Sequence, residues 1–258
     1  MEDTMPWYTA RLLTCLFFLA TASTHAAWLF SVGAGINTWD VDISGDAGEN
    51  ASLEKNGLNL SNEDATEIFV FFEHPVPFLP NVKIAQNDMT FSGSSDNSIR
   101  LIGDVALTGN IYSEADLSHN DLTLYWGLPL PIPLLSIDLG LTARQFDGYI
   151  FARNELNEIQ AQELDFVLPL VYAGITVDTP FGVFVNAKAN YARVAGNSFS
   201  DAQYLVGYNA PIPVPFLTVS VQAGYRSFNV VTDEDLTDID SSIALDGVYG
   251  GATISFGF

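Results

Sequence analysis

The sequence predicts an all-β fold, a transmembrane antiparallel up-and-down β-barrel of about ten strands, and three observations support this prediction. Apolar and polar residues alternate along most of the 258-residue chain. The alternating segments are joined by two different kinds of connection. Beyond residue 26, no uninterrupted apolar segment is long enough for a membrane-spanning helix. The composition argues against a disordered chain, because 48% of the residues are hydrophobic and 12% are aromatic.

The first 26 residues have the features of a secretory signal peptide. Residues 12–22 form an apolar run that follows Arg11, and the small residues Thr24 and Ala26 stand where signal peptidase requires them. We therefore expect cleavage after Ala26, export of the chain, and a barrel formed by residues 27–258. Cys15, the one cysteine, lies in the segment that would be removed, so the exported chain would form no internal disulfide.

Alternation identifies the strands. In residues 135–143 every odd position is apolar and every even position is Ser, Asp, Gly or Thr, and residues 183–191 and 217–226 repeat this arrangement. Because neighbouring side chains of a strand point to opposite faces, each segment would have one apolar and one polar face. Residues 99–107 also look like a strand inside a predicted loop, so eight or twelve strands remain alternatives. The ten expected strands are 28–43, 65–74, 81–91, 117–127, 135–146, 164–177, 182–193, 201–209, 216–228 and 243–258.

The connections separate a membrane barrel from a soluble sandwich, which alternation alone also fits. One set is short and rich in proline, at 74–80, 129–133, 179–182 and 211–216; the other is longer and acidic, at 44–64, 92–116, 147–163 and 229–241. Short turns on one side and long loops on the other are typical of outer-membrane barrels, and an even strand count would place both termini with the short turns. Aromatic residues near strand ends suit interfacial girdles, namely Trp28, Trp39, Tyr125, Trp126, Tyr225 and Phe256.

The end of the chain carries a further signal. Ile254, Phe256 and Phe258 alternate with polar or small residues up to a terminal aromatic. This pattern resembles the signal that the barrel-assembly machinery reads in outer-membrane barrels. We therefore expect that machinery to be a partner during biogenesis.

Several segments together resemble one family of Gram-negative outer-membrane β-barrels, known for a Gly-Gly pair near the C-terminus and without an assigned activity. The matching segments are residues 73–83, 116–125, 136–144 with 146–148, and 246–252, which are spread over the whole predicted barrel. The resemblance implies a β-barrel in the cell outer membrane. It implies no catalytic or ligand-binding residues.

The charges divide into a lumenal group and an acidic exterior. Acidic residues outnumber basic ones by 31 to 9, which gives a net charge of −22 and excludes nucleic acid as a partner. Arg144, Lys188 and Arg226 lie on the polar faces of alternating segments, and at the membrane midplane a lipid-facing position would cost about 2–4 kcal/mol. We expect them to point into the lumen and to pair with Asp138 and Glu67. Such an interior would be either filled by ion pairs or a narrow passage for small polar or cationic solutes.

Candidate catalytic residues are few, and we expect a non-enzymatic protein without a cofactor. His74 opens a turn, where a structural role is expected. His119 lies near Asp116 and Asp121, so the enzymatic alternative is a protease or lipid-modifying site at the outer rim. That alternative lacks a second histidine nearby.

The acidic loops suggest weak cation binding or adhesion as another alternative. We expect no dedicated metal site and a solvated loop. The expected surroundings of the barrel are membrane lipid and lipopolysaccharide, whose phosphates divalent ions could bridge to the loops, and we expect a monomer. The candidate carboxylates are Asp233, Asp235, Asp238 and Asp240.

Overall fold

The computed structural model describes residues 30–47, 51–54, 57–61, 63–76, 78–100, 106–194, 196–232 and 240–258. The expected signal peptide lies outside the described residues, as does Trp28. Within the described part of the chain, no helix is long and apolar enough to cross a membrane. The strands are β1 (Ser31–Asp40), β2 (Asp42–Ala47), β3 (Asp64–Glu73), β4 (Asn81–Asp88), β5 (Thr90–Ser95), β6 (Ile111–Asp116), β7 (His119–Gly127), β8 (Leu135–Asn154), β9 (Ile159–Asp178), β10 (Val183–Val194), β11 (Asn197–Ala210), β12 (Leu217–Thr232) and β13 (Ser241–Gly257).

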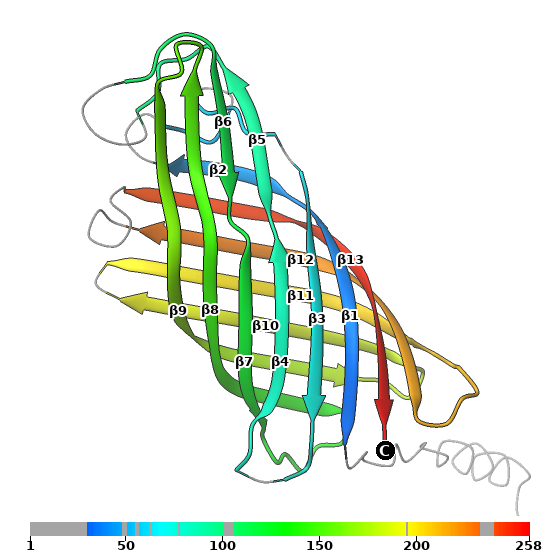
Figure 1. The fold of residues 1–258 in the computed structure, drawn as a ribbon. Coiled ribbons are helices and arrows are strands. Elements are labelled where there is room, and N and C mark those ends of the chain that lie inside the picture. Colours follow the sequence, from blue (N-terminus) through cyan, green and yellow to red (C-terminus); the bar gives the residue numbers. More distant parts are fainter. Residues whose placement is uncertain are drawn as a thin grey trace, which may run out of the picture.

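These elements form one closed antiparallel barrel (Figure 1). β1 pairs with β13 and with β3, and β8 pairs with β7 and with β9, so the sheet closes on itself. Three strands of the wall are each interrupted once, which divides them into β1 and β2, β4 and β5, and β6 and β7. The wall therefore has ten strands in up-and-down order. The prediction of ten strands is confirmed, and the alternatives of eight and twelve are wrong.

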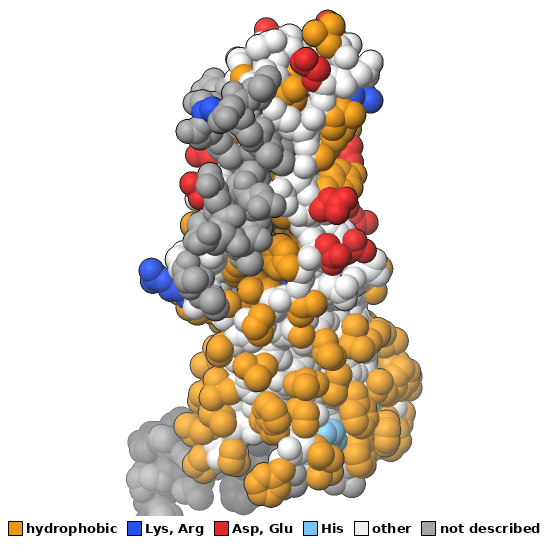
Figure 2. Space-filling view, turned by 60° about the vertical axis from the view of Figure 1, so that its left-hand side comes forward, with side chains coloured by type: hydrophobic (Ala, Val, Ile, Leu, Met, Phe, Trp, Pro, Cys, Tyr) orange, Lys and Arg blue, Asp and Glu red, His pale blue; other side chains and the backbone are white. Residues whose placement is uncertain are grey.

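The outer surface of the barrel carries a continuous apolar band. Figure 2 shows hydrophobic side chains covering the half of the molecule that bears the proline-rich turns, whereas acidic side chains gather on the other half. A water-soluble surface rarely exposes an apolar patch of this extent, but the hydrocarbon core of a membrane would cover it. Residues of the band that are between 41% and 63% exposed include Val32, Ile36, Ile68, Val70, Ile84, Leu122, Leu139, Leu141, Val167, Val171, Ile175, Val185, Val206, Val221, Val248 and Ile254.

The wall continues well beyond this band at the end that carries the long loops. β8 and β9 have 20 residues each, whereas about 9–11 residues suffice to cross a membrane. Two predicted loops are therefore wrong in part: 92–116 contains β6 and the end of β5, and 147–163 is mostly strand, with only residues 155–158 joining β8 to β9. β2 and the ends of β12 and β13 likewise replace parts of the other two loops. The strand-like residues 99–107 form a single isolated bridge between Ile99 and Leu107.

The opposite end, called the turn end here, holds both ends of the described chain. Phe30 and Phe258 exchange backbone hydrogen bonds of 2.9 Å, and their rings stack 5.8 Å apart. His74 has a structural environment in its turn: its Nδ1 accepts a hydrogen bond from the Val76 amide at 3.2 Å, and its Nε2 lies 3.1 Å from the Pro80 carbonyl oxygen.

The predicted aromatic girdle is only partly correct. Trp126, Tyr225 and Phe256 are exposed on the outer surface, as a girdle requires. Trp39 and Tyr125 instead point into the barrel and are buried. Trp39 aligns with Asn37 on the inward face of β1, so strand parity, not aromatic character, decides its direction.

Candidate functional site

The interior of the barrel consists of three layers that follow one another along its axis. The loop-end half contains a buried apolar cluster, called the outer core, which lines a cavity of about 30 Å³. The middle contains a set of charged side chains, called the charged layer, of which five are buried and the two lysines are half-buried. The turn-end half contains a cavity of about 340 Å³ that is open to solvent, called the vestibule. The outer core includes Ile43, Leu53, Phe91, Ile111, Phe146, Ile150, Leu164, Phe199, Phe228, Val230, Ile243 and Leu245. The charged layer comprises Glu67, Lys83, Asp121, Arg144, Lys188, Asp201 and Arg226.

Asp201 is the centre of the charged layer. One of its oxygens accepts hydrogen bonds from Nη2 of both Arg144 and Arg226 at 2.8 Å, and its other oxygen accepts one from Arg226 Nε at 3.0 Å. Arg144 also holds Asp121 in a two-bond fork, with distances of 2.8 and 2.7 Å. Arg226 donates a further bond of 2.9 Å to Asn87. Bidentate arginine–carboxylate pairs of this kind fix both distance and orientation.

Glu67 is the centre of a second group in the same layer. It accepts a hydrogen bond of 3.0 Å from Lys83 and one of 2.7 Å from the Asn37 side-chain amide. Asn37 in turn accepts one from Gln222 at 2.7 Å. Gly251 makes this arrangement possible, since a Cβ atom there would lie 2.0 Å from the Asn37 side-chain oxygen. The second glycine of the Gly-Gly pair therefore has a packing role.

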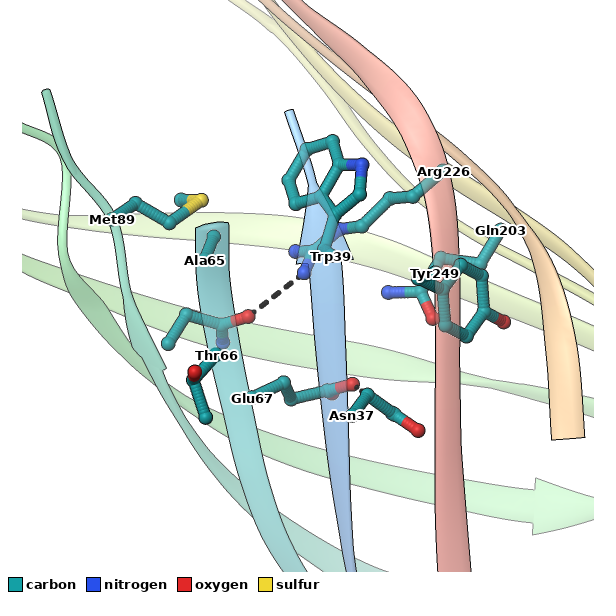
Figure 3. Close-up of a pocket in the computed structure, with 10 residues that line it drawn as sticks. Asn37, Trp39, Ala65, Thr66, Glu67, Met89, Gln203, Arg226 and Tyr249 are labelled. Carbon is teal, nitrogen blue, oxygen red and sulfur yellow. Dashed lines mark hydrogen bonds between the residues drawn. The ribbon is translucent and has the colours of Figure 1, made fainter. Parts of the chain in front are cut away.

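Aromatic rings close the charged layer on the side of the outer core. The Arg226 guanidinium lies 4.8 Å from the centre of the Trp39 ring, and that of Arg144 lies 5.3 Å from the Phe228 ring. Figure 3 shows Arg226 reaching toward Trp39, with Glu67, Tyr249 and Gln203 around them. The cavity that these residues line measures about 10 Å³, which leaves space for about one water molecule.

The vestibule is lined by a mixture of aromatic, hydroxyl, amide and charged groups. Tyr125 and Tyr172 lie side by side with ring centres 5.7 Å apart, and the Tyr125 hydroxyl donates a 2.7 Å hydrogen bond to Glu73. Asp138 lies in the same wall, and Lys188 reaches the cavity from the charged layer. A cavity of this size with a few polar groups has the character of a small-molecule site.

All five charges predicted to face the lumen line the interior in the structure, but their pairing differs from the prediction. Glu67 contacts Lys83, and the two arginines contact Asp201. Asp138 is separated from the arginines and lines the vestibule instead. Sequence reasoning missed the partners that complete the layer, although strand parity places them on inward faces. These residues are Lys83, Asn87, Asp121 and Asp201.

His119 lies inside the molecule and not at the outer rim, where the enzymatic alternative placed it. Its side chain is 2% exposed and packs between the rings of Phe146 and Phe228, whose centres lie 5.2 and 5.9 Å away. Asp121 is engaged by Arg144, and Asp116 is on the outward face of β6. The wall continues past His119 for a further eight residues of β8 beyond Phe146, its register partner. The imidazole is therefore buried, with its Nδ1 3.0 Å from the Leu117 carbonyl oxygen.

Most of the acidic loop cluster lies outside the described residues. Asp233, Asp235 and Asp238 lie outside the described residues, and Asp240 is exposed at the start of the segment that leads into β13. Across the described ranges, no group of three or more His, Cys, Asp or Glu side chains is placed to hold a metal ion.

Comparison with known proteins gives likeness of fold alone. No protein-family model matches the sequence, and no curated protein matches it. The outer-membrane protease OmpT from Escherichia coli aligns with 13% identity over 92% of this chain and 100% of its own, with a TM-score of 0.45. The toluene transporter TodX from Pseudomonas putida aligns with 8% identity over 92% of each chain, with a TM-score of 0.33. The monoaromatic hydrocarbon channel CymD aligns with 8% identity over 93% and 92% of the two chains, with a TM-score of 0.31.

Proposed function

We propose that this protein is a non-enzymatic integral barrel of the Gram-negative outer membrane, with a structural role and a lumen that is closed to solutes at rest. The apolar band, the short turns at one end and the acidic extension at the other support this location. In this orientation the turn end faces the periplasm and the acidic extension meets lipopolysaccharide. Kinship with the Gly-Gly family of outer-membrane barrels is part of this proposal and rests on the sequence resemblance of residues 73–83, 116–125, 136–144 with 146–148, and 246–252 taken together.

The stacking of the outer core on the charged layer is the observation that favours a closed barrel over a narrow passage. A solute that entered from the vestibule would have to separate the buried pairs around Asp201, which costs several kcal/mol for each stranded charge. It would then meet Phe146, Phe228 and their neighbours, which offer an ion no polar partner. A conducting pore needs a continuous polar lining, and the polar lining described here ends at the charged layer.

His119 supports the non-enzymatic part of the proposal. It is the histidine on which the enzymatic alternative depends, and it is packed between aromatic rings. A general acid or base must come within hydrogen-bond reach of its substrate. An enzymatic role would therefore need a site elsewhere on the barrel.

Single-channel recording on the purified protein in a planar bilayer tests the closed barrel. We expect no conductance above that of the lipid alone, while a general porin reconstituted in the same way conducts. Insertion is verified independently by heat-modifiable gel migration, in which folded barrels run differently before and after boiling. Regular unitary currents from verified protein would overturn the proposal of a closed lumen.

A further inference from the structure

The vestibule contains positive and negative groups that are not paired with each other. Its floor carries Lys188, and among the described residues no carboxylate lies within 4.0 Å of the Lys188 ammonium. Its wall toward the mouth carries Asp138, which forms no hydrogen bond or ion pair with any described residue, and Glu73, whose described partner is the Tyr125 hydroxyl. All three side chains are half-buried in an open cavity, so their charges are accessible to a ligand.

The charges at the floor have an excess of one positive unit. Lys83 and Lys188 line a cavity with one further carboxylate, Glu67, because Asp121 and Asp201 are held by the two arginines, so the excess of one is counted in formal charges. The wall near the mouth has the opposite formal sign, since two carboxylates, Asp138 and Glu73, line it. The cavity is therefore positive at its inner end and negative at its outer end.

The register of the strands fixes the separation between the two signs. Asp138 on β8 and Lys188 on β10 are both aligned with Gly174 on β9. Two strand spacings separate their Cα atoms by about 10 Å. Gly174 leaves room for the Tyr172 hydroxyl, which covers the wall between them: a Cβ atom at Gly174 would lie 2.9 Å from that oxygen. A short molecule that carries one charge at each end would span this separation alongside the Tyr172 hydroxyl.

We propose that the vestibule binds small zwitterionic ammonium carboxylates, the class of amino acids and short peptides. The ligand carboxylate contacts Lys188 at the floor, and the ligand ammonium group contacts Asp138 and Glu73 near the mouth. Tyr125 and Tyr172 pack against the ligand between these ends, and their hydroxyl groups lie close to its ammonium group. A simple cation would leave Lys188 unpaired, and a simple anion would leave both carboxylates unpaired.

The direction of access is a separate point that depends on the proposed location. The vestibule opens at the turn end, beside both ends of the described chain, so its ligands would come from the periplasm. Binding does not require that the lumen conducts. Failure of the closed-barrel proposal and failure of this site would therefore appear in different experiments.

Ligand-observed saturation-transfer NMR on the full-length barrel in detergent micelles tests the site with glycylglycine as the probe. N-acetylglycylglycine lacks the ammonium group, and glycylglycine amide lacks the carboxylate; each is expected to bind at least about tenfold more weakly, as loss of one charged hydrogen bond implies. This comparison uses the unaltered protein and so does not depend on the folding of a variant. Equal binding of the blocked and free dipeptides, or no binding of glycylglycine, would overturn the proposal.

Variants then locate the binding. Asp138→Asn and Lys188→Met remove one charge each with little change in volume, and each should weaken glycylglycine binding at least about tenfold. Asp147→Asn is the matched control, because Asp147 is on the same strand as Asp138 but faces outward and is exposed; it should bind as the unaltered protein does. Heat-modifiable migration verifies that each variant is folded. Unchanged affinity in folded Asp138→Asn would remove the ligand from this cavity.

Discussion

Replacement of Asp201 by alanine is expected to be among the most destabilising single changes in the barrel. The Asp201 carboxylate accepts three hydrogen bonds, two of them from Arg226 and one from Arg144, and all three side chains are buried. In Asp201→Ala, Arg144 retains its fork with Asp121, but Arg226 loses its carboxylate partner and keeps only Asn87 and the Trp39 ring. The free-energy change therefore reflects one stranded guanidinium.

Breaking a buried ion pair by removing one partner costs about 3–5 kcal/mol, so Asp201→Ala should lower the free energy of unfolding by about that amount. Asp121→Ala should cost less, because Arg144 would still contact Asp201. The double variant Asp201→Ala, Arg226→Met should recover most of the loss, since it leaves no unpaired charge at Arg226. Urea unfolding in lipid vesicles, followed by tryptophan fluorescence, measures all three. A loss below about 1 kcal/mol for Asp201→Ala, or no recovery in the double variant, would refute this reasoning.

Three further predictions concern the wall, the outer core and the extension. Leu141→Arg, which puts a charge in the apolar band, should cost about 2–4 kcal/mol in vesicle unfolding, whereas Asp147→Arg on the same outward face of β8, beyond the band and aligned with Asp165, should cost little. Phe146→Ala should cost about 3–5 kcal/mol in the same assay and should leave the bilayer silent, because its neighbours keep the outer core apolar. The Tyr149 hydroxyl donates a hydrogen bond to Glu114, and this bond, with some desolvation, raises the Tyr149 pKa to about 12. The stabilisation of the folded barrel that this bond provides is present below the usual tyrosine pKa near 10. It is lost as the pH rises to about 12. Ultraviolet titration should show this late phenol, and Glu114→Gln should bring it back toward 10; a Tyr149 that titrates normally in the unaltered protein would contradict the contact.

The strands of the apolar band could be predicted from the sequence because one pattern continues along their whole length. From residue 135 to residue 143 every odd side chain faces outward, so the apolar positions recur with period two and no interruption. The proline-rich turns mark where each segment ends. Together these signals gave the strand number and the direction of Arg144, Lys188 and Arg226.

The extension could not be predicted because the apolar phase reverses within single strands. In β12 the apolar residues occupy outward odd positions as far as Tyr225, and inward even positions from Phe228 and Val230 onward. β8 reverses in the same way between Ala143 and Phe146. If the apolar residues are assumed to stay on one face, the second half of such a strand has the pattern of a loop. Its abundance of Asp, Ser and Asn, which is required by contact with water, strengthens that error.

Pairing inside the lumen was beyond prediction for a different reason. Alternation specifies which face a side chain occupies, but it does not specify its height or which strand lies opposite. Asp201 and Arg144 are 57 residues apart and come from strands that are not neighbours in the sheet. Asp138 had the correct face and the correct charge. The stagger of the strands places it in the vestibule and leaves Asp201 to meet the arginines.

The charged layer lies at the level where the polarity of the inner and outer faces of the wall reverses. On the turn side of Arg144 and Arg226, the wall is apolar outside and polar inside; beyond them, the wall is polar outside and apolar inside. At this boundary an interior side chain faces neither the open vestibule nor a continuous apolar core. Forked arginine–carboxylate pairs suit that position, because they satisfy each other's hydrogen bonds without water and lie flat against aromatic rings. The reversal of phase therefore favours a paired polar layer at this level, and in the proposed closed barrel this layer is what blocks the lumen.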